Sequence, residues 1–110
     1  MERVSAYGLA RQLQVELTRV LARTDVASLD TELREAVRKL KAVVADVRLD
    51  ARDYEYADTR AEQTERAKEA RGRLTTLRDG IIETSESGVF TAIDVVQLST
   101  RIEQLLDELV

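Results

Sequence analysis

Three aspartates on one face of a predicted helix are the first residues whose types and spacing suggest chemistry. Asp46, Asp50 and Asp53 follow one another at steps of four and three residues, so their carboxylates share a helix face. Carboxylate oxygens of this kind suit hard cations such as Mg²⁺. Arg48 and Arg52 lie among them and can neutralise the same carboxylates. The sequence therefore favours a solvated, ion-paired face over a metal site, and we predict no metal or other cofactor.

Two pairs of glutamates form a second candidate site. They are Glu62 with Glu65, and Glu83 with Glu86, each spaced as E-x-x-E. The pattern resembles the metal-binding motif of the all-α nucleoside triphosphate pyrophosphohydrolases, which are small helical bundles that dimerise around Mg²⁺. The second pair departs from the E-x-x-D that is usual in that family, and polar residues surround the first pair. The resemblance implies a Mg²⁺-dependent nucleotide pyrophosphohydrolase, which we rank as the least favoured of three functions.

The composition argues against several other kinds of catalysis. The chain of 110 residues contains no His and no Cys. It therefore lacks the commonest general acid/base and metal ligand, as well as nucleophilic thiols and disulfides. No apolar run reaches the length of a membrane span, and the N-terminal stretch reads as the start of a helix. We predict a protein that is not an enzyme, lies in the cytoplasm and has no membrane partner.

Basic side chains gather in the stretch that follows two tyrosines, Tyr54 and Tyr56. They are Arg60, Arg66, Lys68, Arg71, Arg73 and Arg78. Basic groups neutralise phosphates and aromatic rings stack on bases, so nucleic acid is one candidate partner. Glutamates are interleaved at spacings that favour ion pairs along a helix, however, and the net charge of the chain is −4. A protein partner is therefore favoured over nucleic acid.

Six residues make up the predicted partner-binding surface. Aromatic and arginine side chains are enriched at the energetic centres of interfaces. Tyr54 continues an apolar seam and is expected in the core, whereas Tyr56 lies off that seam. The predicted surface consists of Arg52, Tyr56, Arg60, Arg66, Arg71 and Arg73. We predict no catalytic residue.

The net charge changes sign along the chain. It is −1 over residues 1–33, +3 over residues 34–78 and −6 over residues 79–110. Such asymmetry either marks a partner surface or reflects helices of opposite sign that attract one another within the fold. Because charge patterning alone is a weak signal, we favour attraction within the fold.

The elements that position these residues are all predicted to be helices, because the chain is rich in Ala, Leu, Glu and Arg and has no Pro. The first is expected from Ser5 to Arg23. A short connection follows, in which Asp25 or Ser28 could cap the next helix. That second helix is expected to begin near Leu29. Its apolar seam consists of Leu33, Val37, Leu40, Val44, Val47, Ala51 and Tyr54.

A second seam follows further along the chain, with the same spacing but another phase. It consists of Ala67, Ala70, Leu74, Leu77 and Ile81. On one straight helix, Tyr54 and Ala70 would lie about 160° apart around the axis. Either the chain turns back between Asp50 and Thr59, or one helix runs from Leu29 to Ser87 and needs a dimer partner to cover both seams. The change of phase favours the turn, and the capping-box pattern that begins at Thr59 supports it.

The last connection carries the clearest local signals. Gly88 stands where a helix end favours a left-handed residue. Thr91 and Asp94 then form a capping-box pattern at the start of the final helix. The apolar positions of that helix are Val95, Leu98, Ile102, Leu105, Leu106 and Leu109.

These observations predict one all-α domain over residues 1–110, an antiparallel four-helix bundle with a long, protruding central hairpin. The alternative is a dimer of three helices with one very long central helix. We predict a non-catalytic protein–protein interaction or adaptor module that binds through its helix faces and polar hairpin. Its partner would be another protein or a second copy of this chain. A nucleic-acid-associated four-helix accessory protein is the second hypothesis.

Overall fold

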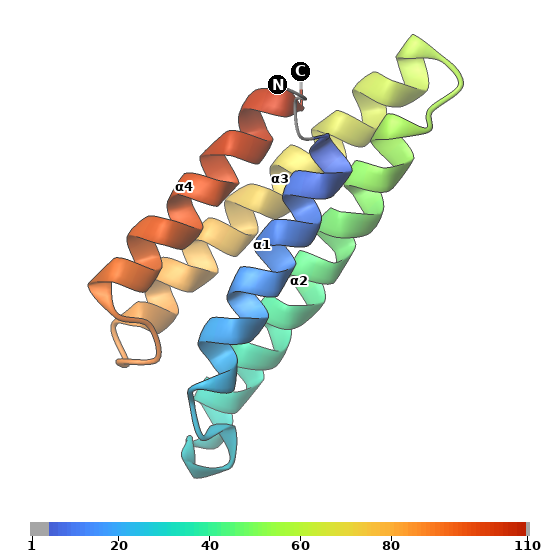
Figure 1. The fold of residues 1–110 in the computed structure, drawn as a ribbon. Coiled ribbons are helices and arrows are strands. Elements are labelled where there is room, and N and C mark those ends of the chain that lie inside the picture. The colour runs from blue at the N-terminus through green and yellow to red at the C-terminus, as the bar shows by residue number, and fades with distance from the viewer. Residues whose placement is uncertain (1–4, 110) are drawn as a thin grey trace.

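A computed structural model describes residues 5–109 of the chain (Figure 1). Within that range the helices are α1 (Ala6–Ala22), α2 (Thr31–Glu55), α3 (Arg60–Ser85) and α4 (Ala92–Glu108), with one 3-10 turn, η1 (Val26–Ser28), between α1 and α2. Successive α-helices run antiparallel. The predicted all-α four-helix bundle is confirmed.

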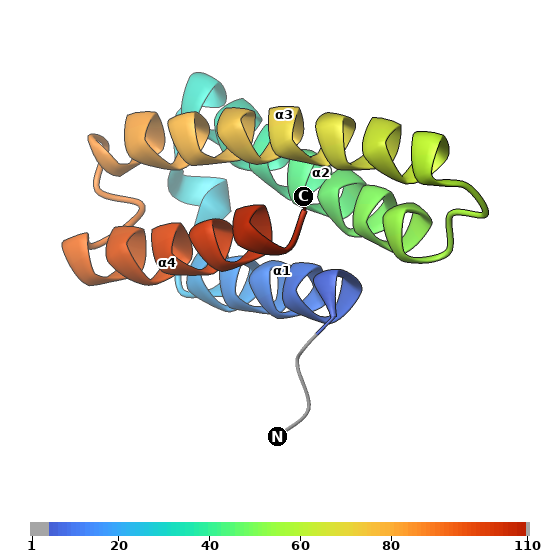
Figure 2. The ribbon, with the colours of Figure 1, turned by 90° about the horizontal axis from the view of Figure 1, so that it is seen from above.

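The helices form a closed ring of neighbours. α2 packs most extensively against α3, α1 packs against α2 and α4, and α4 completes the ring against α3. Figure 2 shows the α2–α3 hairpin as one layer and α1 with α4 as the other. The long axis of the molecule measures 46 Å and its shortest axis 17 Å.

The core lies between the layers, and all four α-helices contribute to it. The seam positions predicted for α2, α3 and α4 are buried or half-buried, and they belong to one apolar cluster with residues of α1. At the centre of this cluster are Leu13, Leu17, Val44, Leu74, Leu77, Leu98 and Ile102. The stripe of each helix thus determines which side faces inward.

The chain reverses direction between Glu55 and Arg60. Tyr56 is the C-terminal cap of α2, and the Thr59 hydroxyl accepts a hydrogen bond from the backbone N–H of Glu62 at 3.1 Å, which caps α3. The turn falls within the predicted window. The alternative of one continuous central helix is wrong, because the reversal lets both seams face the same core.

The tip of the hairpin projects beyond α1 and α4 (Figure 1). Two hydrogen bonds hold the base of this projection. The Tyr54 hydroxyl donates to the Glu108 carbonyl at 3.1 Å, and the Tyr7 backbone N–H donates to Glu55 Oε1 at 2.7 Å. Tyr54 therefore packs against the core, as predicted, and ties the hairpin to the end of α4.

The start of α2 differs from the prediction. Asp30 caps this helix by accepting a hydrogen bond from the Leu33 backbone N–H at 2.8 Å. The prediction that Asp25 or Ser28 caps it is wrong, because Ser28 instead donates to the Asp25 carbonyl within η1. The η1 turn takes up residues 26–28, so α2 begins at Thr31 rather than near Leu29.

The last connection matches its predicted signals. Gly88 has a φ of +82°, a left-handed backbone conformation that residues other than glycine rarely adopt. At the start of α4, the Thr91 hydroxyl accepts from the Asp94 N–H, and Asp94 Oδ2 accepts from the Thr91 N–H. The predicted capping box is confirmed.

Candidate functional site

The tip of the hairpin holds three of the six residues predicted to bind a partner. Arg52 lies in the last turn of α2, Tyr56 caps that helix, and Arg60 is the first residue of α3. The Tyr56 side chain is 74% exposed, and both arginines are exposed. Arg52 makes a single ion pair, at 3.6 Å, with the adjacent Asp53. We refer to Arg52, Tyr56 and Arg60 together as the tip cluster.

The other three predicted residues contact groups of the chain itself. Arg66 pairs with Glu69 one turn later on α3 at 3.1 Å. Arg73 reaches across to α2, where it pairs with Asp46 at 3.2 Å and with Asp50 at 2.6 Å. The six residues therefore do not form one uniformly free surface.

Arg71 has a structural contact that the sequence does not reveal. Its Nη1 donates to the backbone carbonyls of Leu106 and Leu109, at 2.9 and 3.0 Å. The last carbonyls of a helix have no partner within that helix. Arg71 on α3 therefore caps the end of α4. No local signal indicates this role, because the carbonyls belong to residues more than thirty positions further along the chain.

Asp50 is a buried carboxylate, 6% exposed, between α2 and α3. Its Oδ2 lies 2.6 Å from Arg73 Nε, so the two side chains form an ion pair. Burial raises the pKa of Asp50 above its ordinary value. Arg73 acts in the opposite direction and Glu69 adds to the rise.

The three aspartates considered for Mg²⁺ are divided among arginines. Asp46 and Asp50 both face Arg73, and Asp53 pairs with Arg52. In residues 5–109, no three acidic side chains come together in a way that could hold a metal ion. The ion pairs that the sequence favours are present, but Asp50 is buried rather than solvated.

The two glutamate pairs lie at opposite ends of α3. Glu62 is in its first turn and Glu83 in its last. At 1.5 Å per residue, the two are about 30 Å apart along the helix axis. Within one chain, the fold does not bring the two E-x-x-E pairs to a common site.

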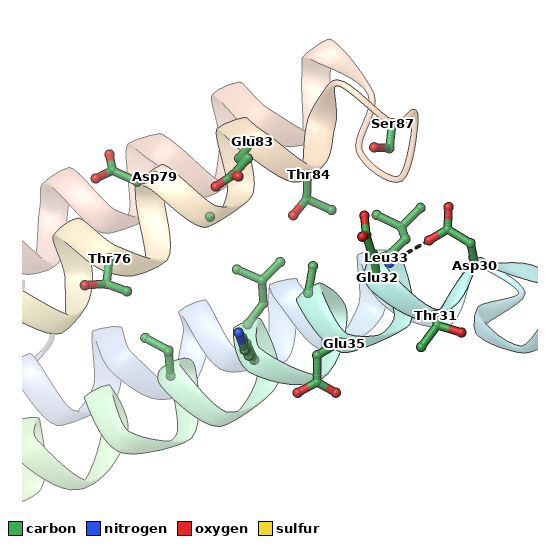
Figure 3. A pocket seen from close by; sticks show the side chains of 15 residues that line it. Asp30, Thr31, Glu32, Leu33, Glu35, Thr76, Asp79, Glu83, Thr84 and Ser87 are labelled. Atoms are coloured by element: carbon green, nitrogen blue, oxygen red, sulfur yellow. Dashed lines mark hydrogen bonds between the residues drawn. The ribbon is translucent and has the colours of Figure 1, made fainter.

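An open cleft lies between the second half of α3 and the first half of α2, at the end of the hairpin opposite the tip (Figure 3). Its volume is about 850 Å³, and its lining is rich in acidic residues. The amino-acid sequence does not predict this cleft. The available signal was Thr84, which follows Ile81 by three residues and puts a hydroxyl where the α3 seam would continue.

The other hollows on the surface are more open than this cleft. None of the helices within residues 5–109 has the length and apolar character that a membrane crossing needs. Comparisons of the chain with protein-family models, with curated proteins and with solved structures gave no significant match. The function therefore has to be argued from the geometry of the tip cluster and the cleft.

Proposed function

We propose that this protein is a non-catalytic protein–protein interaction module that works in the cytoplasm and binds its partner through the tip of the α2–α3 hairpin. The observation that carries the proposal is the tip cluster. A tyrosine that is 74% exposed stands between two exposed arginines on a part of the fold that projects beyond its neighbours.

The chemistry of the tip cluster suits a protein interface. Tyrosine and arginine are the side chains most often found at the energetic centres of such interfaces. Tyrosine adds a large, rigid contact area with only two side-chain torsions, so little entropy is lost on binding. Because the tip lies outside the core, a partner can reach it without any rearrangement of the bundle.

The basic side chains of α3 support a protein partner over nucleic acid. Phosphate binding needs cations that are free to replace counterions. Arg66, Arg71 and Arg73 already contact acidic side chains or carbonyls of the chain. Tyr54, the second aromatic candidate for base stacking, is half-buried and bonded to Glu108. Only Tyr56 remains available as a stacking platform at the tip.

Site-specific photocrosslinking in the native cells tests the proposal. A photoreactive phenylalanine analogue replaces Tyr56, and a matched variant carries it at Thr75, which is exposed on the same hairpin but far from the tip. We expect a discrete protein adduct from position 56 that is absent from position 75. The adduct should weaken when Arg52 and Arg60 are both changed to alanine. An adduct of twice the chain mass would identify a second copy as the partner.

Two results would count against the proposal. One is an equal set of adducts from both positions, which indicates chance collisions. The other is a nuclease-sensitive adduct, which would favour the nucleic-acid hypothesis. Once the partner is identified, Tyr56→Ala should weaken binding at least tenfold without changing the melting temperature, because the ring adds little to the fold.

A further inference from the structure

The cleft opposite the tip has an apolar floor. Leu33, Ala36 and Val43 are half-buried, and with Leu40 they form one stripe along the first half of α2. At the bottom of the cleft, Leu40 packs directly against Gly80 of α3, where a Cβ atom would come within 2.7 Å of Leu40 Cδ2. The stripe runs over eleven residues, a rise of about 15 Å along the helix. It is long enough to receive about three turns of another helix.

The rim of the cleft is acidic. Five carboxylates line it against a single lysine, Lys39. Two of the five already have partners, since Glu35 pairs with Arg38 and Asp30 caps α2. The other three are Glu32, Asp79 and Glu83, and none of them has an ion-pair partner within residues 5–109. The free charge of the rim is therefore negative.

The side chain of a largely buried threonine points into the cleft between these acidic walls. Thr84 is only 5% exposed, and its hydroxyl has no hydrogen-bond partner in the described part of the chain. Figure 3 shows its side chain directed from α3 toward α2, with the Glu32 carboxylate rising toward it from the opposite side. The buried side-chain atoms that lack a partner within the described residues do not include the Thr84 oxygen, so this oxygen reaches the solvent of the cleft. A polar group of a ligand can therefore take the place of water on this hydroxyl.

The spread of the carboxylates decides between kinds of ligand. A metal ion needs oxygens that converge within about 2.5 Å of one point. The cleft acids do not converge, because no metal-holding group of acidic residues occurs in residues 5–109. Charges that are spread along an apolar stripe instead match the pattern of a basic amphipathic helix, which places apolar side chains inward and cations at the edges.

We infer that this acidic cleft binds an amphipathic helix of a partner protein, with lysine or arginine side chains flanking its apolar face. The apolar face lies on the stripe from Leu33 to Val43. Its cations approach Glu32 and Glu83 from either side, and one of them donates a hydrogen bond to the Thr84 hydroxyl. The inference does not depend on the tip cluster, because the cleft lies at the other end of the hairpin and can be altered separately.

The direct test uses a synthetic probe. The probe is a fluorescein-labelled helix of 14 residues built from leucine and lysine, and binding is followed by fluorescence anisotropy. A second peptide has the same length and sequence except that two internal residues are replaced by proline, so it cannot form the helix. We expect saturable binding of the helical probe, weakened by salt, and at least tenfold weaker binding of the proline peptide. Equal binding of the two peptides would overturn the inference.

Matched variants locate the binding. Glu32→Gln with Glu83→Gln should weaken the helical probe at least fivefold. Glu65→Gln with Asp107→Asn makes the same change in net charge at exposed sites away from the cleft and should leave the affinity within twofold. Equal losses in both double variants would reduce the effect to general charge attraction and overturn the inference.

Thr84→Val separates binding from folding. Valine keeps the shape of threonine and removes only the hydroxyl. We expect the probe to bind threefold or more weakly while the melting temperature stays equal or rises. Sedimentation of the free protein completes the test. A dimer that Glu32→Gln with Glu83→Gln dissociates would show that a second copy occupies the cleft, and the inference of a basic partner helix would then be wrong.

Discussion

Asp50 and Arg73 form an ion pair whose two members contribute unequally to stability. Asp50 is buried and gives up its hydration, whereas the Arg73 side chain remains 44% exposed and also contacts Asp46. Removing the arginine leaves a buried charge without compensation. Removing the negative charge leaves an arginine that still has water and a second carboxylate.

The two substitutions should therefore act in opposite directions. Arg73→Met should lower the free energy of unfolding at pH 7 by about 2 kcal/mol, less than for a fully buried pair because Arg73 is partly solvated. Asp50→Asn should leave it unchanged or raise it by up to about 1 kcal/mol. Urea denaturation measures both, with Arg52→Met as the exposed control. Equal losses in both variants would show that the pair is simply stabilising.

The pH dependence of Asp50 follows from its raised pKa. Near pH 4, an unfolded aspartate is about half ionised. Folded Asp50 is less ionised at the same pH, because burial raises its pKa. As the pH rises through the pKa of the folded state, the buried charge develops and stability falls. The Asp50→Asn variant should lack this decline, which a series of melts from pH 4 to pH 7 would reveal.

The pKa of Asp94 shifts in the opposite direction to that of Asp50. Burial alone raises its pKa, but the hydrogen bonds from the Thr91 backbone and the Arg23 guanidinium outweigh burial and hold the pKa below its ordinary value. The Asp94 carboxylate accepts the Arg23 contact at 2.6 Å. Because the folded pKa is depressed, its contribution to stability is full above about pH 4 and is lost as the pH falls through the folded pKa.

Asp94→Asn should consequently cost about 1 to 2 kcal/mol at pH 7, since it removes a charged cap and an ion pair. The loss should shrink as the pH falls through the lowered pKa of folded Asp94, because the wild-type carboxylate then becomes protonated. Asp107→Asn, an exposed change on the same helix, should alter stability by less than about 0.5 kcal/mol. A pH-independent loss in Asp94→Asn would contradict the role of the charge.

Two glycines, Gly88 in the last connection and Gly72 in the middle of α3, have opposite effects on the stability of the fold. Gly88 has a φ of +82°, whereas Gly72 lies inside α3 with nothing within 4 Å of where a Cβ would stand. Gly88→Ala should destabilise the protein by about 1 kcal/mol. Gly72→Ala should stabilise it by about 0.5 to 1 kcal/mol, because alanine favours the helix. Thermal melts of the two variants should shift in opposite directions.

The sequence predicts those elements well whose signals are local. The capping box of α4 and the left-handed Gly88 need only neighbouring residues. The turn near Tyr56 follows from the phase change between two seams, although the stretch holds no Gly, Pro or Asn. The start of α2 is harder, because Asp25, Ser28 and Asp30 are all good caps and are close together in the chain. The η1 turn decides among them, because its first residue, Val26, and its C-terminal cap, Leu29, pack on the core.

The candidate sites were harder to predict from the sequence than the helices, because most of their contacts join residues that are far apart in the chain. Exposure of Tyr56 follows from its place off the seam. The partners of Arg71 and Arg73 do not follow from sequence, because each lies on another helix and depends on how the helices are offset along their axes. The acidic cleft depends on the same offset, which sequence periodicity leaves undetermined.

Across the molecule, many of the charges that make up the gradient pair with one another between helices. Arginines at the end of α1 and on α3 pair with acidic side chains of α4 and α2. Examples are Arg23 with Asp94 and Arg78 with Glu103. The preference for attraction within the fold agrees with these contacts. The tip cluster and the acidic cleft stand at opposite ends of one hairpin, so the partners proposed for the two surfaces would not compete for the same space.

The ring arrangement has a kinetic consequence. Neighbours along the chain are also neighbours in space, except where α1 meets α4 to close the ring. Chains dominated by local contacts refold quickly, and a chain with no proline has no slow isomerisation step. We expect one fast exponential phase in stopped-flow refolding. If closure of the ring comes last, Asp94→Asn will speed unfolding and leave the refolding rate nearly unchanged, so the seam between α1 and α4 would govern how long each folded molecule persists.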